Sequence, residues 1–175
     1  MPGLGEPPPA AMLSHTLLEL NMSQAVSRAF EAQTHAIEAG DFAAIAKDYL
    51  VPAPIFLFDC VLRAETPAEV LTFLKLFFKL IAEGGTKQVS KELIGMSPLP
   101  NSARLCTVKC NYFDENGRVL GSTKLRQWCR ENENGMQIEL TEVLSLPFGL
   151  EAEDISKMYA NARKGAAYPL AARQV

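Results

Sequence analysis

Apolar residues recur at helical spacing in the first half of the chain. Over residues 23–39, every third or fourth position falls on one stripe formed by Val26, Phe30, Gln33 and Ile37. Ser23 is a candidate N-cap for this helix, and Gly40 is a typical helix stop. The pattern therefore predicts an amphipathic helix that ends at Ala39.

Two further helices are predicted before residue 86. Asp41 would cap the first of them, whose buried side would carry Phe42, Ile45, Ala46 and Tyr49. The second begins at the capping box Thr66-Pro67-Ala68-Glu69 and ends at Gly84-Gly85. Its polar residues occupy only one narrow face, so we expect the sheet or a second subunit to cover the rest.

Strand patterns occupy most of the remaining chain. Residues 55–62 are predicted to form one strand with two mostly apolar faces, and residues 87–146 are predicted to form four more. Asn116-Gly117 and Asn134-Gly135 suit two-residue hairpin turns, and residues 98–101 suit a looser one. The last four strands should therefore form a meander.

The two ends of the chain differ from its centre. Residues 1–21 open with glycine and proline, so we expect a flexible arm there with room for one helix, and Met22 is a candidate translation start. Residues 151–164 place acidic side chains first and basic ones last, as a helix dipole favours. We expect an arm over 1–21, one domain over 22–148, and a C-terminal helix and tail over 149–175.

Composition narrows the functional classes. A chain of 175 residues that is 48% hydrophobic supports one ordinary core. The net charge of -3 and the absence of basic blocks argue against a nucleic-acid partner. No apolar run reaches membrane-spanning length, and the amino terminus lacks the basic start of a secretory signal. We therefore expect a cytoplasmic protein that does not enter a membrane, with four reduced cysteines.

The order of these elements resembles the NTF2-like superfamily, which includes SnoaL-like and ketosteroid-isomerase-like proteins. The resemblance covers about residues 23–148 and is carried by Glu38-Ala39-Gly40-Asp41-Phe42, residues 45–49, residues 55–59 and the capping box. It implies an α+β fold in which N-terminal helices pack on a curved antiparallel sheet. It also implies a cone-shaped cavity and, in many members, a homodimer.

Four polar residues interrupt apolar rows that could face such a cavity: Asp59, Glu142, Lys109 and Gln33. Asp59 and Glu142 are the candidate catalytic acids or bases, and Lys109 and Gln33 are candidate ligand contacts. The alternative is that both acids pair with basic side chains of neighbouring strands, including Lys109, Lys124 and Arg126, or lie at exposed strand ends.

Aromatic residues supply further candidates. Trp128 and Tyr112 could wall a pocket for a flat apolar ligand, or could belong to the core or a dimer seam. Tyr49 and Arg126 complete the ligand-binding candidates. Compared with the steroid isomerases, Gln33 falls where their oxyanion-stabilising tyrosine lies and Leu57 where their general base lies, so steroid isomerase activity is not expected.

No cofactor or metal site is predicted. Cys106 and Cys110 on one strand face would lie about 13 Å apart, and the sequence has no H-E-x-x-H, paired C-x-x-C, P-loop, G-x-S-x-G or G-x-G-x-x-G motif. The sequence leaves three hypotheses. The first is a pocket for a small apolar or aromatic ligand, serving a cofactor-independent isomerase, cyclase or dehydratase. The others are a non-enzymatic dimerisation or protein-interaction module, and a ligand-binding or sensing protein.

Overall fold

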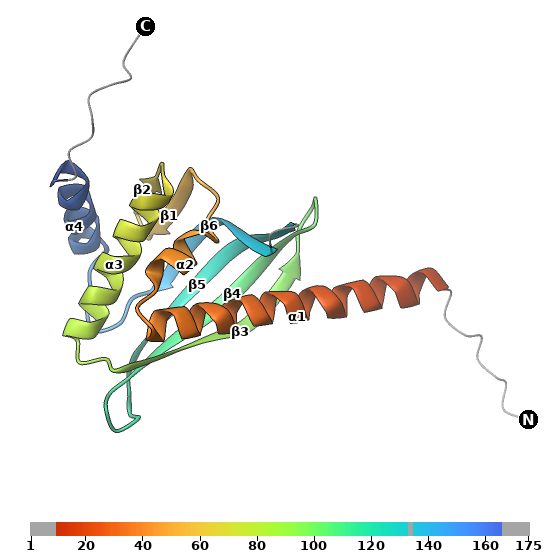
Figure 1. Cartoon of the computed structure of the whole chain (residues 1–175), viewed down its shortest axis with the longest axis horizontal. Helices are drawn as coiled ribbons and strands as arrows, with labels where there is room; N and C mark the ends of the chain where they lie inside the picture. Colours follow the sequence, from red (N-terminus) through yellow and green to blue (C-terminus); the bar gives the residue numbers. More distant parts are fainter. Residues whose placement is uncertain (1–9, 133–134, 166–175) are drawn as a thin grey trace, which may run out of the picture.

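The computed structural model describes residues 10–132 and 135–165. Three helices lie on one side of a sheet: α1 (Ala10–Glu38), α2 (Phe42–Ala46) and α3 (Pro67–Glu83). A fourth helix, α4 (Ala152–Gly165), packs against α3 at the end of the molecule away from α1 (Figure 1). The predicted C-terminal helix is therefore present, with bounds that differ by one residue at each end.

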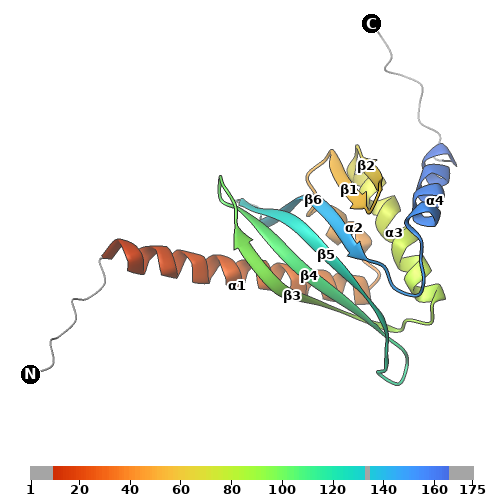
Figure 2. The ribbon, with the colours of Figure 1, turned by 180° about the vertical axis from the view of Figure 1, so that it is seen from behind.

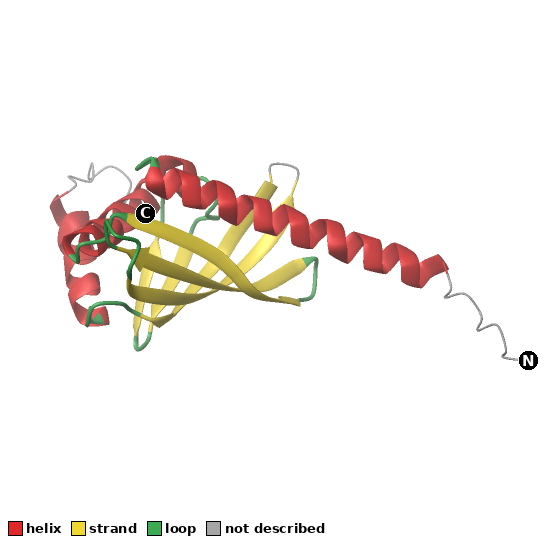
Figure 3. Cartoon of the chain, turned by 90° about the horizontal axis from the view of Figure 1, so that it is seen from below, coloured by secondary structure: helices red, strands yellow, loops and turns green. Residues whose placement is uncertain are grey.

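The sheet has six strands in the order β2-β1-β6-β5-β4-β3. Their bounds are β1 (Ala53–Leu57), β2 (Cys60–Ala64), β3 (Gln88–Pro98), β4 (Ala103–Phe113), β5 (Val119–Asn132) and β6 (Gly135–Ser145). The predicted meander is formed by β3 to β6, and the sheet curves strongly (Figures 2 and 3). These features confirm the predicted α+β fold. One pairing differs, because β1 runs parallel to β6 and makes the sheet mixed.

Helix α1 is longer than the sequence pattern predicted. It begins at Ala10 and continues without interruption through residues 10–21, which were expected to belong to an arm with room for one separate helix. The physical reason is composition, since neither glycine nor proline occurs between Ala10 and Glu38 and most residues there favour helix. Residues 1–9 lie outside the described part of the chain.

Helix α2 is shorter than predicted. Asp41 caps it as expected, accepting a hydrogen bond of 3.1 Å from the Ala44 N–H, but the helix ends at Ala46. Beyond it, the backbone turns to pair with β6: Ile138 N–H donates to the Asp48 carbonyl, and Leu50 N–H donates to the Ile138 carbonyl. This pairing places Asp48 and Tyr49 against the sheet.

The strand predicted over residues 55–62 is instead a hairpin. Leu57 pairs with Cys60, so Phe58 and Asp59 form a two-residue turn between β1 and β2. Phe58 has a φ of +55°, an unfavourable value for a bulky side chain. Both halves of the hairpin are apolar, and this made the segment look like one continuous strand.

The apolar faces of α3 are covered within the chain. Val70, Phe73, Leu74, Phe77 and Ile81 are all buried. Phe78 stacks on Phe42 of α2 with ring centroids 5.2 Å apart, and Phe73 meets Tyr159 of α4 edge-on at 6.0 Å. The sheet, α2 and α4 therefore provide the covering that the sequence pattern required.

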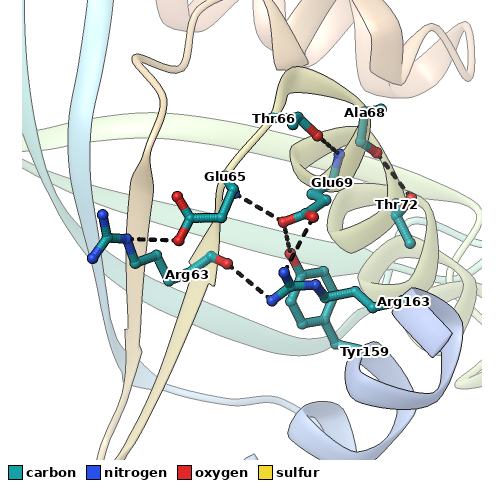
Figure 4. A network of polar contacts seen from close by, with 8 residues as sticks. All are labelled: Arg63, Glu65, Thr66, Ala68, Glu69, Thr72, Tyr159 and Arg163. Atoms are coloured by element: carbon teal, nitrogen blue, oxygen red, sulfur yellow. Dashed lines mark hydrogen bonds and ion pairs between the residues drawn. The ribbon is translucent and has the colours of Figure 1, made fainter. Parts of the chain in front are cut away.

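A buried carboxylate joins α3 to α4 (Figure 4). The Glu69 N–H donates to the cap Thr66, and the Glu69 carboxylate accepts hydrogen bonds from the Glu65 N–H at 2.8 Å and the Tyr159 hydroxyl at 3.5 Å. Arg163 lies 3.2 Å from the same carboxylate as an ion pair. The predicted capping motif thus also anchors the C-terminal helix.

Candidate functional site

A cavity lies between the concave face of the sheet and the three helices that cover it. The enclosed part of the cavity has a volume of about 60 Å³, counted as the space open to the centres of water molecules. All the unfilled space together, including the open mouth, is about 580 Å³. It is lined by Gln33, Ile37, Ile45, Tyr49, Ile55, Phe73, Leu74, Phe77, Phe78, Lys91, Cys110, Tyr112, Thr123, Leu125, Gln127, Thr141 and Val143. A mostly apolar lining with a few polar groups is typical of small-molecule sites.

Lys91 and Gln33 form the first polar contact of this cavity. The Lys91 ammonium donates a hydrogen bond to the Gln33 amide oxygen and lies 4.5 Å from the centre of the Phe30 ring. Gln33 in turn donates through Nε2 to Asp48 at 2.6 Å. Gln33, whose side chain is buried, therefore bridges a lysine on β3 and an aspartate beyond α2.

Burial controls the ionisation of both charged groups. It lowers the pKa of Lys91 below its ordinary value, and the nearby thiols and Asp48 oppose this change. Burial raises the pKa of Asp48, whereas the Gln33 hydrogen bond and the Lys91 charge oppose that rise. Lys91 as a whole residue is only half-buried, but its side chain lines the cavity. The pKa of Lys91 therefore depends on the desolvation of its ammonium group.

A second polar cluster is built around Gln127, which is fully buried. Its amide nitrogen donates to Thr141 Oγ1 at 3.2 Å and to the Tyr49 hydroxyl at 3.4 Å. Its amide oxygen, Oε1, has no hydrogen-bond partner among the described residues. Burial raises the pKa of Tyr49 to about 12, so this phenol is neutral at physiological pH.

The remaining polar groups of the lining form hydrogen bonds with each other or are uncharged. The Tyr112 hydroxyl donates to Thr123 Oγ1 at 2.9 Å, and burial raises the pKa of Tyr112. Burial also raises the pKa of the Cys110 thiol. Among the described lining residues, Lys91 is therefore the one with a basic side chain, and none is acidic.

Three of the eight residues selected from the sequence lie in this lining, namely Gln33, Tyr49 and Tyr112. The other five lie elsewhere. Asp59 is exposed at the tip of the β1–β2 turn, because the predicted strand is a hairpin. The prediction that Asp59 shares a hollow with Glu142 is therefore wrong.

Glu142 lies on the outer face of the sheet. It pairs in register with Arg126, and the two side chains form an ion pair of 3.3 Å. This is the alternative arrangement that the sequence left open. The predicted inward row was wrong because β6 carries a bulge: Trp128 pairs with Leu140, whereas Cys129 pairs with Ile138. Residues 136 and 138 face inward before the bulge. Because of the extra residue, positions 141 and 143 face inward after it, instead of 140 and 142.

Lys109 and Trp128 also face outward. On β4 the inward residues are Cys106, Val108, Cys110 and Tyr112, so the alternate row with Lys109 lies on the other face. Trp128 lies between Leu105 and Leu140 on that outer face, where it cannot wall the cavity. The predicted cavity roles of Lys109, Trp128 and Arg126 are therefore wrong.

Sequence reasoning missed Lys91, Gln127 and Thr141. The sequence did contain a signal for the first two. Lys91 shares a strand face with the apolar residues Val89 and Leu93, and Gln127 shares one with Leu125 and Cys129. Thr141 could not be found in this way, because its face depends on the bulge. Within the described residues, no group of three or more histidine, cysteine or acidic side chains could hold a metal ion.

No protein-family model matches the sequence, and a search of curated proteins gave no match. Within residues 10–132 and 135–165, no helix combines the length and apolar character that a membrane span needs. Solved structures do match. An NTF2-like protein with a cystatin-like fold from Novosphingobium aromaticivorans is 11% identical, with a TM-score of 0.58 over 89% of this chain and 98% of that one.

Two Streptomyces proteins are similar to the same extent. Aln2 from a Streptomyces species is 13% identical with a TM-score of 0.57, over 78% of this chain and 94% of that one. ActVI-ORFA from Streptomyces coelicolor is 14% identical with a TM-score of 0.56, over 75% of this chain and 98% of that one. At such identities the likeness concerns the fold, and the chain has the NTF2-like, cystatin-like fold that the order of its elements predicted.

Proposed function

We propose that this protein binds a small, largely apolar molecule in the cavity between its helices and its sheet. The observation that carries the proposal is the cavity itself, in which an apolar lining surrounds a few buried polar groups. Such an arrangement buries the body of a ligand and fixes its orientation by hydrogen bonds.

The size and chemistry of the cavity support a small ligand. A cavity of about 150 Å³ holds benzene, whereas this one offers about 60 Å³ of enclosed space, so a ring-sized ligand would extend into the open mouth. The aromatic rings of Phe73, Phe77 and Tyr112 in its lining favour a flat ring system. Storage, sensing and catalysis are all compatible with such binding.

A catalytic form of the proposal would use different residues from those first predicted. No aspartate or glutamate belongs to the described lining. An isomerase, cyclase or dehydratase without a cofactor would therefore have to move protons through Lys91, Tyr49 or a ligand group. Binding is the simpler proposal, because it requires no base in the cavity.

Thermal unfolding in the presence of neutral aromatic compounds tests the proposal. A panel of benzene, naphthalene and 1-naphthol should contain compounds that raise the melting temperature, since a ligand of the folded state stabilises it. Val143→Phe fills the cavity and should abolish the shift. Leu140→Phe, on the outer face of the same strand, should preserve it. If neither this panel nor aromatic acids shifted the melting temperature of the wild-type protein, the proposal would be contradicted.

We propose homodimerisation separately, on the basis of exposed apolar side chains. Phe58 and Val61 on the β1–β2 hairpin are 59% and 57% exposed, and β2 is an edge strand. Light scattering at micromolar concentration should give the mass of a dimer, and Phe58→Ser combined with Val61→Ser should give that of a monomer. A monomeric mass for the wild-type protein would contradict this second proposal.

A further inference from the structure

We propose that the cavity selects an aromatic acid that also carries a hydrogen-bond donor, with the acid group at Lys91 and the donor at Gln127 Oε1. The inference rests on the proposed function and specifies its ligand class. It uses two independent features of the lining, a cation without an acidic neighbour inside the cavity and a buried acceptor without a partner among the described residues.

The charges near the cavity are separated by Gln33. Lys91 lines the cavity, whereas Asp48 lies in another recess lined by Ala32, Gln33, Ala36, Ala44, Ile45 and Asp48. The Gln33 amide touches both charged groups, since it accepts from Lys91 and donates to Asp48. The ammonium therefore faces the ligand space while its nearest carboxylate stays outside, and this favours an anionic ligand oxygen.

Lys91 also retains hydrogen-bonding capacity. An ammonium group has three N–H donors, and the described contacts of Lys91 Nζ are the Gln33 oxygen and the face of the Phe30 ring. A carboxylate or enolate oxygen would provide the charged acceptor that this group otherwise lacks in the cavity. A neutral apolar ligand would instead leave the ammonium desolvated without compensation.

Gln127 sets the second requirement. Its Nε2 is occupied by Thr141 and Tyr49, while Oε1 has no partner among the described residues and the side chain is fully buried. A buried acceptor left unpaired is unfavourable, because it has lost its hydrogen bond to water and gained none in return. A ligand hydroxyl or N–H that reaches Oε1 would remove this cost, so ligands with such a donor should be preferred.

Proton uptake should accompany binding of the acid. Burial lowers the pKa of Lys91, and an anion beside it would raise that pKa again. The other titratable groups that act on Lys91 are Asp48 and the thiols of Cys106, Cys110 and Cys129. Burial raises the pKa of the Cys110 thiol, and the contact with Cys106 together with burial raises the pKa of the Cys129 thiol. These two thiols therefore stay neutral, whereas the hydrogen bond with Cys129 lowers the pKa of the Cys106 thiol.

Isothermal titration with three matched probes tests the inference. The probes are 4-hydroxybenzoate, benzoate without the donor, and 4-hydroxybenzyl alcohol without the charge. We expect 4-hydroxybenzoate to bind about tenfold or more tightly than either of the others, because the alcohol lacks the charged contact at Lys91 and benzoate lacks the donor for Gln127 Oε1. Titrations in two buffers of different ionisation enthalpy should show proton uptake for the acids only.

Variants assign each preference to its residue. Lys91→Met should remove the preference for 4-hydroxybenzoate over the alcohol, and Lys91→Arg should retain part of it. Gln127→Leu should remove the preference for 4-hydroxybenzoate over benzoate. Lys109→Met, on the outward face of β4, is the matched control and should change neither preference. Circular dichroism and thermal unfolding establish that each variant folds.

The outcomes separate the inference from the proposed function. If neutral aromatic compounds bind but the affinity for 4-hydroxybenzyl alcohol equals or exceeds that for 4-hydroxybenzoate, the inference is overturned and the proposed function stands. If Lys91→Met binds the acids as well as the wild-type protein does, the anion does not lie at Lys91 and the inference is also overturned. If neither these probes nor the neutral panel binds, both proposals fail.

Discussion

Lys91 of β3 and Gln33 of α1 are joined by a hydrogen bond although 58 residues separate them in the chain. The contact fastens the longest helix to an edge strand of the sheet, and it does so inside the cavity. A packing contact and a candidate ligand group are therefore the same side chain. This relationship makes the stability of the protein sensitive to the ionisation of Lys91.

The first prediction concerns that sensitivity. The folded protein holds the pKa of Lys91 below its ordinary value of 10.5, so between the two pKa values the unfolded chain binds one more proton than the folded one. Stability therefore rises with pH in this window, by at most about 1.4 kcal/mol per pH unit. Below the folded-state pKa, the cost of burying the charge is fully present.

Lys91→Met removes this ionisation and keeps an apolar side chain. Urea unfolding between pH 7 and about pH 9.5 should show the wild-type protein gaining stability relative to Lys91→Met as the pH rises. The upper limit avoids the tyrosines and the ordinary lysines, and other groups cancel in the comparison. A stability difference that stays constant or falls with pH would contradict the lowered pKa of Lys91.

A second prediction concerns the attachment of α4. Glu69→Gln removes the negative charge that pairs with Arg163 and leaves the buried polar contacts mismatched. It should lower the free energy of unfolding by about 1–3 kcal/mol. Glu83→Gln, at the exposed end of the same helix, should cost less than about 0.5 kcal/mol. Equal effects of the two substitutions in urea unfolding would show that Glu69 does not anchor α4.

The turn between β1 and β2 gives a third prediction. Phe58 has a φ of +55° and is 59% exposed, so its ring contributes little packing within its own chain while its backbone is strained. At concentrations where the protein is monomeric, Phe58→Gly should raise the free energy of unfolding by about 0.5–1 kcal/mol. Val61→Gly, on the same hairpin and also exposed, should lower it. Destabilisation by Phe58→Gly would mean that the ring makes contacts that outweigh the strain.

A fourth prediction follows from the positions of the two acids first chosen from the sequence. Asp59 is exposed at a turn, and Glu142 pairs with Arg126 on the outer face of the sheet. Asp59→Asn and Glu142→Gln should therefore leave ligand affinity and any turnover unchanged. A loss of affinity of more than about tenfold in titration, in either variant, would return a role to these carboxylates.

Most elements of the fold could be predicted, because their starts and stops depend on local sequence. Thr66 and Pro67 start α3, and Gly117 with a φ of +75° lies in the β4–β5 turn, although this turn spans residues 114–118 and not the two residues predicted. The predicted turn at Asn134-Gly135 could not be compared, since Asn134 lies outside the described residues. Local signals of this kind do not report which strand face meets a helix.

The candidate site was harder to predict, because it depends on strand faces. Glu142 and Thr141 differ by one position, and the bulge opposite Trp128 decides which of them faces the cavity. Lys109 was chosen although its strand has a second, more completely apolar row through Val108. A single sequence does not reveal the register in which two strands pair. A shift of that register by one residue exchanges the two faces of a strand.

The proposed ligand lies between the helices and the sheet. Methyl-labelled protein and unlabelled 1-naphthol allow a direct test, since nuclear Overhauser effects report which methyl groups lie within a few ångström of the ring. A ligand in the cavity should give signals to cavity residues such as Ile37, Leu74 and Val143. Signals confined to outer-face residues such as Leu105 and Leu140 would show that the ligand does not bind in the cavity.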